Sequence, residues 1–427
     1  MISFFRTTTN NGIEHARVYL HGLLKPGSSR RNLSGIEDAV DGADYEGLQH
    51  FIANSPWQAA PLMNHVAAEV SRLLDGPQCM VYVDECFTSK KGTKSVGVAK
   101  MHNERLGKMD NCQATVFLAI GRGRRVALAG ARLYLPREWR EDPARCLSAG
   151  IPENFRIYKS KAALVLELVQ HLRGLGTRFA ATWLHDRHGN DPSLLRALDS
   201  AGEVFVADVP GDLRVALEKP VPEVKSPMTL SSASAWADSH SADAWVPLVL
   251  REGSKVEVAL EFVHQCVWWH EDGTGAAKCW HLVALRLLDA YGRRGKISWT
   301  MSNAGVETPP ARIVAMACSR LCIDRSFHEL KASLDMADYQ IRGWLAWHHH
   351  TALLMLALLF QLQERMVHAQ EPPPLSDAEI ADLLLHHLPA AGVSRVRDTA
   401  AARQRSQPPG LKGNGDYHPT ALMDLSE

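Results

Sequence analysis

The sequence predicts an α/β protein in which a mixed β-sheet is flanked by helical segments and interrupted by a β-rich insertion. Apolar residues recur at helical spacing through residues 1–75, and short β-rich runs separated by turns begin at Cys79. From Phe179 onward, strand-like runs alternate with a helical run. This order of helices, a β-meander and α/β alternation is typical of a mixed sheet covered by helices.

Residues 1–75 are expected to form a helical N-terminal region. Its helical segments are "IEHARVYLHGLL", a stretch around "YEGLQHFIANSPW", and "PLMNHVAAEVSRLL". Gly and Pro separate them, and the last ends before Asp75-Gly76-Pro77.

Residues 76–210 are expected to form the first part of the sheet core. The run "CMVYVDECF" predicts a strand that ends at Asp84, and "CQATVFLAIG" and "RVALAGARLYL" predict two further strands with "GRGRR" as the hairpin tip between them. An amphipathic helix, "SKAALVLELVQHLRGLG", comes next. The runs "FAATWLHD" and "EVFVADVP" then predict two strands joined by the helix "DPSLLRALDSAG".

The predicted secondary structure changes twice in the second half of the chain. Residues 211–305 are expected to form a β-rich insertion, because strand-like runs alternate there with Gly-rich turns. Residues 306–370 return to helix and complete the core. Residues 371–427 are expected to hold a last short helix and then a disordered tail rich in arginine and proline.

Composition limits the classes of function. Lysine plus arginine and aspartate plus glutamate number 47 each in 427 residues, so a nucleic-acid-binding protein of this composition must concentrate its positive charge in local patches. Eight cysteines without a CxxC pair suit a reducing cytoplasm. The longest apolar run, residues 351–360, is about half of the ~20 residues that a bilayer requires. We therefore expect a soluble protein without a signal peptide.

Three aspartates are candidates for a metal site. Asp84 and Asp186 each come at the end of an apolar strand, where the sheet fixes their positions, and oxygen ligands of this kind suit Mg²⁺. Asp324 lies on a predicted helix. At 100° per residue, Arg320 lies ~40° and Lys331 ~20° from it around the helix, which would line a phosphate-binding face. The residues alone leave alternatives open: a strand-end aspartate is often a turn former or helix cap, and a charged stripe often only pairs at i,i+4.

Several long motifs resemble bacterial insertion-sequence transposases of the DDE superfamily, the group described as DDE superfamily endonucleases. The resemblance runs from about residue 15 to 370. It is carried by "YLHGLL", "LQHFIANSPW", "VDECFTSKKGTKSVGVAK", "LGKMDNCQATVFLA", "RLYLPREWREDPARCLSAGIPE", "RSFHELKASLDMADYQIRGWLAWHHH" and "ALLFQLQERM". It implies an RNase H-like catalytic core with a β-rich insertion before the last catalytic helix, and an N-terminal region that binds DNA.

The resemblance assigns the catalytic and metal-binding triad to Asp84, Asp186 and Asp324, with Mg²⁺ as the ion and Mn²⁺ as its alternative. In the wider transposase signature of Tyr, Arg, Glu and Lys, Arg320 and Lys331 match the spacing and are implied to contact DNA. Ala317 stands at the tyrosine position and Asp324 at the glutamate position. An aspartate there removes one methylene of reach, and a ~1 Å misplacement of a catalytic group can cost ~100-fold in rate.

The implied activity is metal-dependent cleavage of double-stranded DNA at the element's ends, followed by strand transfer into target DNA. A homodimer or higher multimer on DNA, in the bacterial cytoplasm at the nucleoid, is implied with it. The alternative is a catalytically weakened relative that acts as a DNA-binding protein, which the departures at Ala317 and Asp324 favour. A third reading is a nuclease that cleaves but does not join strands.

Two other clusters have alternative interpretations. The basic turn with Lys90, Lys91 and Lys94 is expected to contact the DNA backbone, although lysine-rich turns are often only solvated. A second set of side chains suggests zinc, but its spacings match no structural zinc pattern and the tryptophans among them suggest strand packing instead. This set comprises His264, Cys266, His270, Cys279 and His281.

Overall fold

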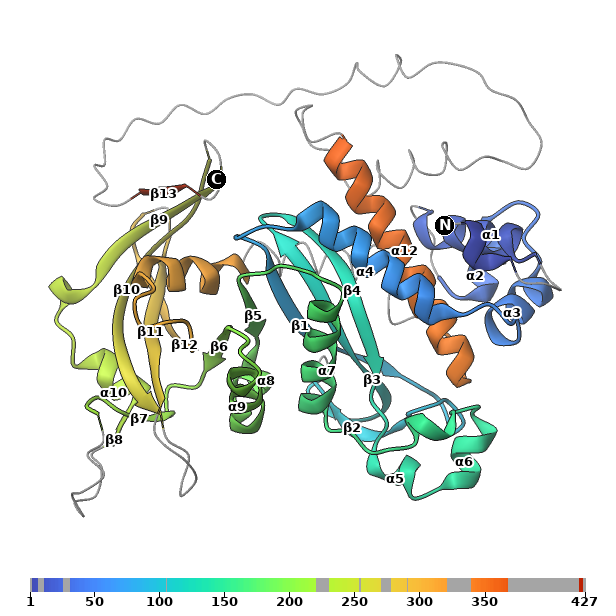
Figure 1. Ribbon diagram of the computed structural model, residues 1–427, viewed down its shortest axis with the longest axis horizontal. Coiled ribbons are helices and arrows are strands. Elements are labelled where there is room, and N and C mark those ends of the chain that lie inside the picture. Colours follow the sequence, from blue (N-terminus) through green and yellow to red (C-terminus); the bar gives the residue numbers. More distant parts are fainter. Residues whose placement is uncertain are drawn as a thin grey trace.

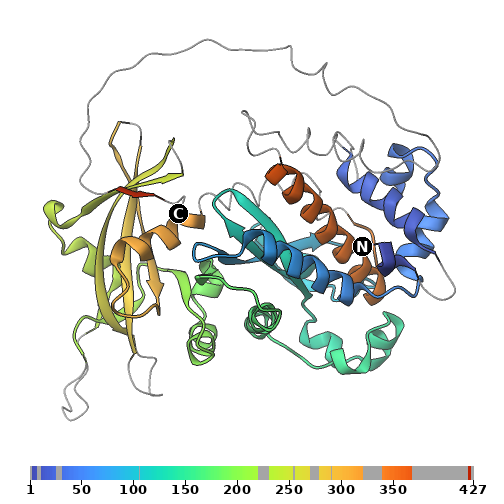
Figure 2. The same ribbon diagram turned by 45° about the horizontal axis from the view of Figure 1, so that its top comes forward.

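The computed structural model describes residues 2–6, 11–25, 31–104, 106–219, 230–252, 255–269, 278–289, 291–320, 339–367 and 422–424. Along its longest axis the N-terminal helices lie at one end, the core sheet in the middle and the β-rich insertion at the other end (Figure 1). The view turned by 45° shows the same order (Figure 2).

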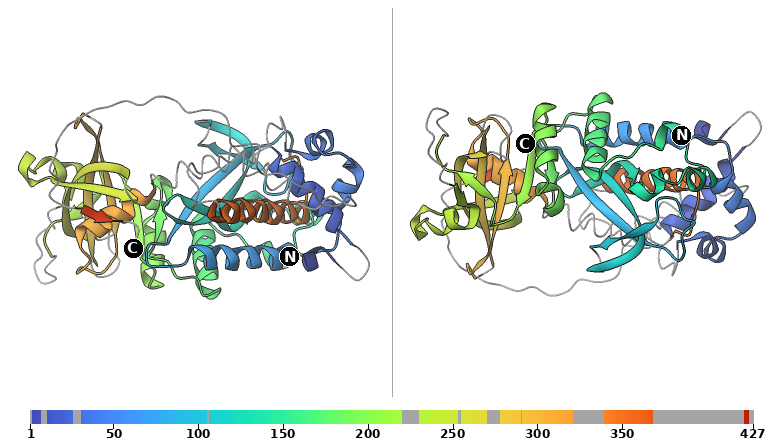
Figure 3. Two further views of the ribbon diagram at one scale, coloured as in Figure 1. Left: turned by 90° about the horizontal axis from the view of Figure 1, so that it is seen from above. Right: turned by 90° about the horizontal axis from the view of Figure 1, so that it is seen from below.

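The N-terminal region is helical, as predicted. It contains η1 (Ile2–Phe5), α1 (Ile13–Leu24), α2 (Leu33–Ala39), α3 (Tyr45–Ala53) and α4 (Ala59–Leu74). Side-chain caps begin two of these helices: Asn32 accepts a hydrogen bond from the Gly35 N–H, and Asp44 accepts one from the Gly47 N–H. Seen from above, α4 runs beside the long helix α12 (Trp344–Val367), against which it packs (Figure 3).

Helix α12 is the central core helix. By length and composition it could cross a membrane, but 83% of its most apolar window is buried inside the protein. Its His349 ring stacks on Trp57 with 3.8 Å between centroids, and its two nitrogens lie 2.9 and 2.8 Å from the carbonyl oxygens of Ile52 and Trp57. The neighbouring His350 Nδ1 lies 2.8 Å from the Tyr19 hydroxyl. These histidines therefore join α12 to the N-terminal helices.

The core sheet has the strand order of an RNase H-like fold. Its hydrogen-bonded order is β4–β3–β1–β5–β6, in which β3 is antiparallel to both of its neighbours, β4 and β1, and β1, β5 and β6 are parallel. Short β2 pairs with the beginning of β3. The strands are β1 (Met80–Ser89), β2 (Ala99–Asn103), β3 (Lys108–Arg122), β4 (Arg125–Leu133), β5 (Ala181–Leu184) and β6 (Phe205–Val209). The predicted fold class is therefore confirmed.

Strand β1 differs from its prediction. We expected it to end at Asp84, but it continues to Ser89 because β3 remains its partner as far as Cys112. The parallel pairing with β5 ends earlier, at Val83 opposite Leu184. Asp84 is therefore the first residue beyond the parallel ladder rather than the last of the strand.

Helices pack on the core strands. Ser160 caps α7 (Lys161–Gly174) by accepting a hydrogen bond from the Ala163 N–H, and α7 packs on β3 and β4. The hairpin tip predicted at "GRGRR" is confirmed, since Arg122 pairs with Arg125 and Gly123 takes a φ of 59°. The remaining elements here are α5 (Arg137–Arg140), α6 (Pro143–Ser148), η2 (Glu153–Phe155), α8 (Asp186–Gly189) and α9 (Pro192–Ser200).

The insertion is β-rich, as predicted, but its sheet is continuous with the core. Strand β12 pairs with β6 from Trp299 opposite Val209 to Ser302 opposite Val206. The insertion contains β7 (Arg214–Ala216), β8 (Leu230–Ser232), α10 (Ala233–Asp238), η3 (Ala242–Ala244), β9 (Val246–Glu252), β10 (Lys255–Trp269), β11 (Lys278–Leu288) and β12 (Arg294–Ser302). The C-terminal strand β13 (Leu422–Asp424) pairs with β9. The short helix and tail predicted within 371–427 otherwise lie outside the described residues.

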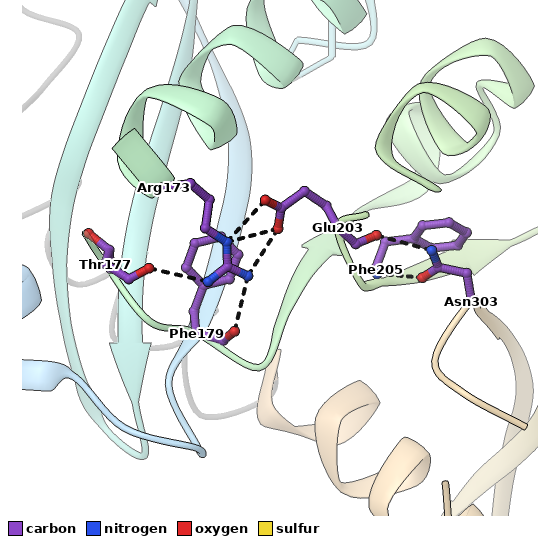
Figure 4. Close-up of polar contacts among 6 residues, drawn as sticks. All are labelled: Arg173, Thr177, Phe179, Glu203, Phe205 and Asn303. Carbon is purple, nitrogen blue, oxygen red and sulfur yellow. Dashed lines mark hydrogen bonds and ion pairs between the residues drawn. The ribbon is translucent and has the colours of Figure 1, made fainter. Parts of the chain in front are cut away.

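A polar network joins the insertion to the core where the chain leaves β12 (Figure 4). The Glu203 carboxylate accepts hydrogen bonds of 3.0 Å from Arg173 Nε, and the Arg173 guanidinium lies 3.4 Å over the Phe179 ring. Asn303 donates to the Glu203 carbonyl at 3.0 Å and accepts from the Phe205 N–H at 2.8 Å. The segment after β12 is thereby fixed against the beginning of β6.

Candidate active site

The two predicted strand-end aspartates follow neighbouring parallel strands. Val83 of β1 pairs with Leu184, the last residue of β5, so Asp84 lies one residue and Asp186 two residues beyond that pair. Asp186 begins the short helix α8, and Asp84 is half-buried. Because carboxyl ends of parallel strands meet at one edge of a sheet, the backbone brings both residues to the same edge.

A further carboxylate, Asp208, lies at this edge and was missed by the sequence analysis. Leu184 of β5 pairs with Ala207 of β6, so Asp208 occupies the position on β6 that Asp84 occupies on β1. Its Oδ2 lies 3.4 Å from Nδ1 of His185, the residue between β5 and Asp186. A signal existed in "EVFVADVP", a third apolar run with an aspartate near its end.

Arg320, which is predicted to contact DNA, lies at this edge. Residues 310–320 are helical, and the Arg320 guanidinium forms an ion pair with Asp208 Oδ2. It also lies 5.7 Å over the Trp183 ring, which stacks on His185 at 5.4 Å. Asp208 therefore holds the predicted DNA-contacting cation beside the strand ends.

The helical residues 310–320 are attached to β1 beside Arg320. The Tyr82 hydroxyl donates a 2.9 Å hydrogen bond to Ser319 Oγ. Tyr82 and Asp84 lie two residues apart on one strand and so share a face. Ala317, at the signature's tyrosine position, is buried in the core, while Asp324 and Lys331 lie outside the described residues.

The opposite face of β1 carries a buried charge cluster. Glu85 Oε2 forms an ion pair with Lys161 of α7, and Glu85 Oε1 lies 3.0 Å from Nε2 of His188 in α8, at an angle poor for a hydrogen bond. The Glu85 side chain is 6% exposed. Burial raises the pKa of Glu85, but the contacts with His188 and Lys161 outweigh it and hold the pKa below its usual range.

The contact between Glu85 and His188 links β1 to α8. Glu85 directly follows Asp84, and His188 lies two positions after Asp186. Gly189, the last residue of α8, approaches β6 so closely that a Cβ there would lie 2.0 Å from the Asp208 carbonyl oxygen. The short helix that begins with Asp186 is thus fixed to β1 on one side and to β6 on the other. Neither contact was anticipated from the sequence.

The three lysines of the predicted basic turn differ in their surroundings. Lys91 and Lys94 are exposed, but the Lys90 ammonium donates to the Tyr339 carbonyl and lies 3.8 Å over the Tyr339 ring. Lys90 therefore connects β1 to the segment before α12. Its contact with DNA stays a prediction, as do those of Lys91 and Lys94.

The donors at the strand ends fit the predicted ion. Asp84 and Asp186 offer hard carboxylate oxygens, the ligands that Mg²⁺ and Mn²⁺ take in proteins. Asp208 adds a third carboxylate at the same edge, although Arg320 already neutralises it. Among the described residues, this edge thus concentrates oxygen ligands and one cation.

Comparison with known proteins decides the family. A family model described as "DDE superfamily endonuclease" matches residues 4–252. The chain belongs to the DDE superfamily endonuclease family. The predicted resemblance is therefore confirmed, and the matched DDE region contains both Asp84 and Asp186 but ends before Arg320.

Two individual proteins are similar to this DDE superfamily member. A probable transposase for insertion sequence element IS701 from Microchaete diplosiphon is 28% identical over 162 residues, which are 38% of this chain and 39% of that protein. A cryo-EM structure of the piggyBac transposase synaptic complex with hairpin DNA aligns with a TM-score of 0.44 at 10% identity, covering 91% of this chain and 74% of that one. Family membership supports nuclease or transposase activity in general, and divalent metal ions are general in the superfamily.

Proposed function

We propose that this protein is a DNA transposase that binds the ends of its insertion sequence and catalyses divalent-metal-dependent cleavage and strand transfer. The observation that carries the proposal is the backbone register at the strand ends. It brings Asp84 and Asp186 to one edge of an RNase H-like sheet, with Arg320 at that edge.

In this proposal Asp84 and Asp186 hold Mg²⁺ or Mn²⁺, and Asp324 completes the triad. Such ions, when bound, lower the pKa of an attacking hydroxyl and offset the charge of the scissile phosphate. Arg320 supplies a planar cation for a phosphate oxygen, and its pairing with Asp208 positions it before DNA binds. The Glu85–His188 contact holds α8, the helix that begins with Asp186, against β1.

The proposed path of the DNA backbone continues beside α8. A hollow of about 480 Å³ there is lined by Lys100, Arg137, Lys161 and Arg187 among other residues. Lys161 and Arg187 are ion-paired with Glu85 and Glu104, and Glu138 also lines the hollow, so Lys100 and Arg137 are the proposed contacts with the DNA backbone. The exposed Lys91 and Lys94, and Lys331, are proposed as further backbone contacts, and a homodimer or multimer as the form that holds two DNA ends.

The alternative proposal is a catalytically weakened relative that acts as a DNA-binding protein. Its support is the residue types at Ala317 and Asp324. Ala317 is 3% exposed in the 310–320 helix, so the signature's tyrosine hydroxyl has no counterpart at this position. This alternative predicts binding to the element's ends without cleavage.

The test uses the full chain and a duplex that carries the DNA flanking its gene, in Mg²⁺ or Mn²⁺. We expect cleavage and joined products from the wild type, and neither from Asp84→Asn or Asp186→Asn, whereas binding in a gel-shift assay persists. The matched control is Asp212→Asn, which changes an exposed aspartate four residues beyond Asp208. Cleavage that survives Asp84→Asn would refute the assignment, and binding without cleavage by the wild type would favour the alternative.

A further inference from the structure

Strands β10 and β11 pair in the insertion (Figure 1). Four side chains of metal-ligand type share one face of this ladder. Cys266 of β10 is directly opposite His281 of β11. Two residues away on either side of this pair, Trp268 is opposite Cys279 and His264 is opposite Val283. Because alternate residues of a strand point to the same face, His264, Cys266, Cys279 and His281 lie together.

The nitrogen and sulfur atoms of three of these side chains lie close together. His264 Nε2 lies 2.8 Å from His281 Nδ1, and Cys266 Sγ lies 3.9 Å from the same nitrogen. All three atoms lie within 4.8 Å of one another. Tetrahedral zinc with bonds of ~2.0–2.3 Å places neighbouring ligand atoms roughly 3.3–3.8 Å apart, so small side-chain movements would complete the arrangement.

The orientation of the fully buried His281 supports a metal. Its Nε2 lies 2.9 Å from the Gly305 carbonyl oxygen, which leaves Nδ1 directed at the cluster. Metal-binding histidines are typically oriented in this way, by a carbonyl or carboxylate on the other ring nitrogen. Cys279 lies on the same face of the ladder, opposite Trp268, and is the candidate for the fourth ligand.

We propose that His264, Cys266, Cys279 and His281 bind a structural zinc ion. Two nitrogen and two sulfur ligands are a common set for closed, tetrahedral zinc sites. This site is chemically distinct from the carboxylate edge, whose oxygen ligands select Mg²⁺ or Mn²⁺. The sequence spacing concealed it because the ligands come from two paired strands, and strand pairing rather than a short loop brings them together.

The zinc ion would stabilise more than one hairpin. Gly305, which accepts the hydrogen bond from His281, lies five residues before the described helical residues 310–320, which include Arg320. Strand β11 also pairs with β12, whose other edge pairs with β6. The ion would therefore fix the insertion against the segment that leads into the active-site helix, and this holds whatever reaction the carboxylate edge catalyses.

The test is metal analysis of the full chain, expressed with zinc and freed of loosely bound ions on a desalting column. We expect a single zinc ion per chain, retained by Asp84→Asn and by the control Cys146→Ser, which alters a buried cysteine outside the cluster. Cys266→Ser and His281→Gln should weaken zinc binding by more than the ~100-fold that loss of an outer-shell partner costs. Zinc retained at full stoichiometry by Cys266→Ser would overturn the proposal.

A second measurement does not depend on the variants folding. Exchange of cobalt(II) into the wild-type chain should give the intense visible bands of a tetrahedral site and a thiolate-to-cobalt charge-transfer band. Absence of these bands would overturn the proposal, as would a disulfide between Cys266 and Cys279 in protein isolated under reducing conditions.

Discussion

Replacing Glu85 with alanine tests how the candidate active site is held together. The carboxylate lies between Lys161 of α7 and His188 of α8, with side-chain exposures of 6% for Glu85, 17% for Lys161 and 8% for His188. Removing it leaves a buried ammonium group without its carboxylate. Breaking a buried ion pair by removing one partner typically costs about 3–5 kcal/mol, because the remaining charge stays desolvated.

Glu167, on the helix that also carries Lys161, provides a matched control. Glu167 of α7 also has two cationic partners, Arg132 with 3.0 Å between Nε and Oε1, and Lys159. Its side chain is 34% exposed, so solvent screens both pairs. Surface pairs of this kind contribute about 0–1 kcal/mol. Glu167→Ala should therefore lower the free energy of unfolding by roughly 3 kcal/mol less than Glu85→Ala does.

The assay is urea-induced unfolding of both variants and the wild type, with Glu85→Gln to separate loss of charge from loss of volume. The pKa of Glu85 is lowered in the fold, so its stabilisation is present above the unfolded pKa of ~4.3 and is lost as pH falls through the lower folded pKa. Glu85→Ala should remove this acid-dependent part. Equal destabilisation by Glu85→Ala and Glu167→Ala would refute the reasoning.

Three further predictions follow from single contacts. Gly189→Ala should reduce cleavage by ~100-fold or more, measured at saturating metal, because the new methyl group displaces α8 from the Asp208 carbonyl; unchanged cleavage would contradict this. Burial lowers the pKa of His350 to about 3, so the ring stays neutral in the folded protein at pH values where it is protonated in the unfolded chain. The free energy of unfolding should therefore fall by up to ~1.4 kcal/mol per pH unit as the pH drops from ~6.5 towards 3. Urea unfolding of His350→Gln at several pH values should show a weaker dependence of this free energy on pH. Arg137→Ala should weaken DNA binding equally for all sequences and reduce its salt dependence in a gel-shift series; a sequence-dependent loss would exclude a phosphate contact.

The sequence predicted the fold class because it depends on local patterns. Apolar runs identified the strands that lead to Asp84 and Asp186, and the family resemblance implied an RNase H-like core. Asp208 could not be selected in the same way. Its proximity to His185 depends on the pairing of β6 with β5, which a local sequence pattern does not report.

Other features were hidden for the same physical reason. The predicted end of β1 at Asp84 was wrong because the long partner β3 extends the strand to Ser89. The His/Cys cluster appeared to lack zinc spacing because its geometry is set by the Cys266–His281 strand pair. Linear spacing reports contacts within a helix or loop, and it does not report contacts across a sheet.

The most direct test of the proposed function is metal-dependent cleavage of the flanking DNA ends by wild type, Asp324→Ala and Asp324→Glu. The account predicts cleavage by the wild type in Mg²⁺ or Mn²⁺, abolished by Asp324→Ala and retained by Asp324→Glu. Full cleavage by Asp324→Ala would contradict the triad. Absence of wild-type cleavage that Asp324→Glu restores would show that the chain binds DNA with a site that has lost its chemistry.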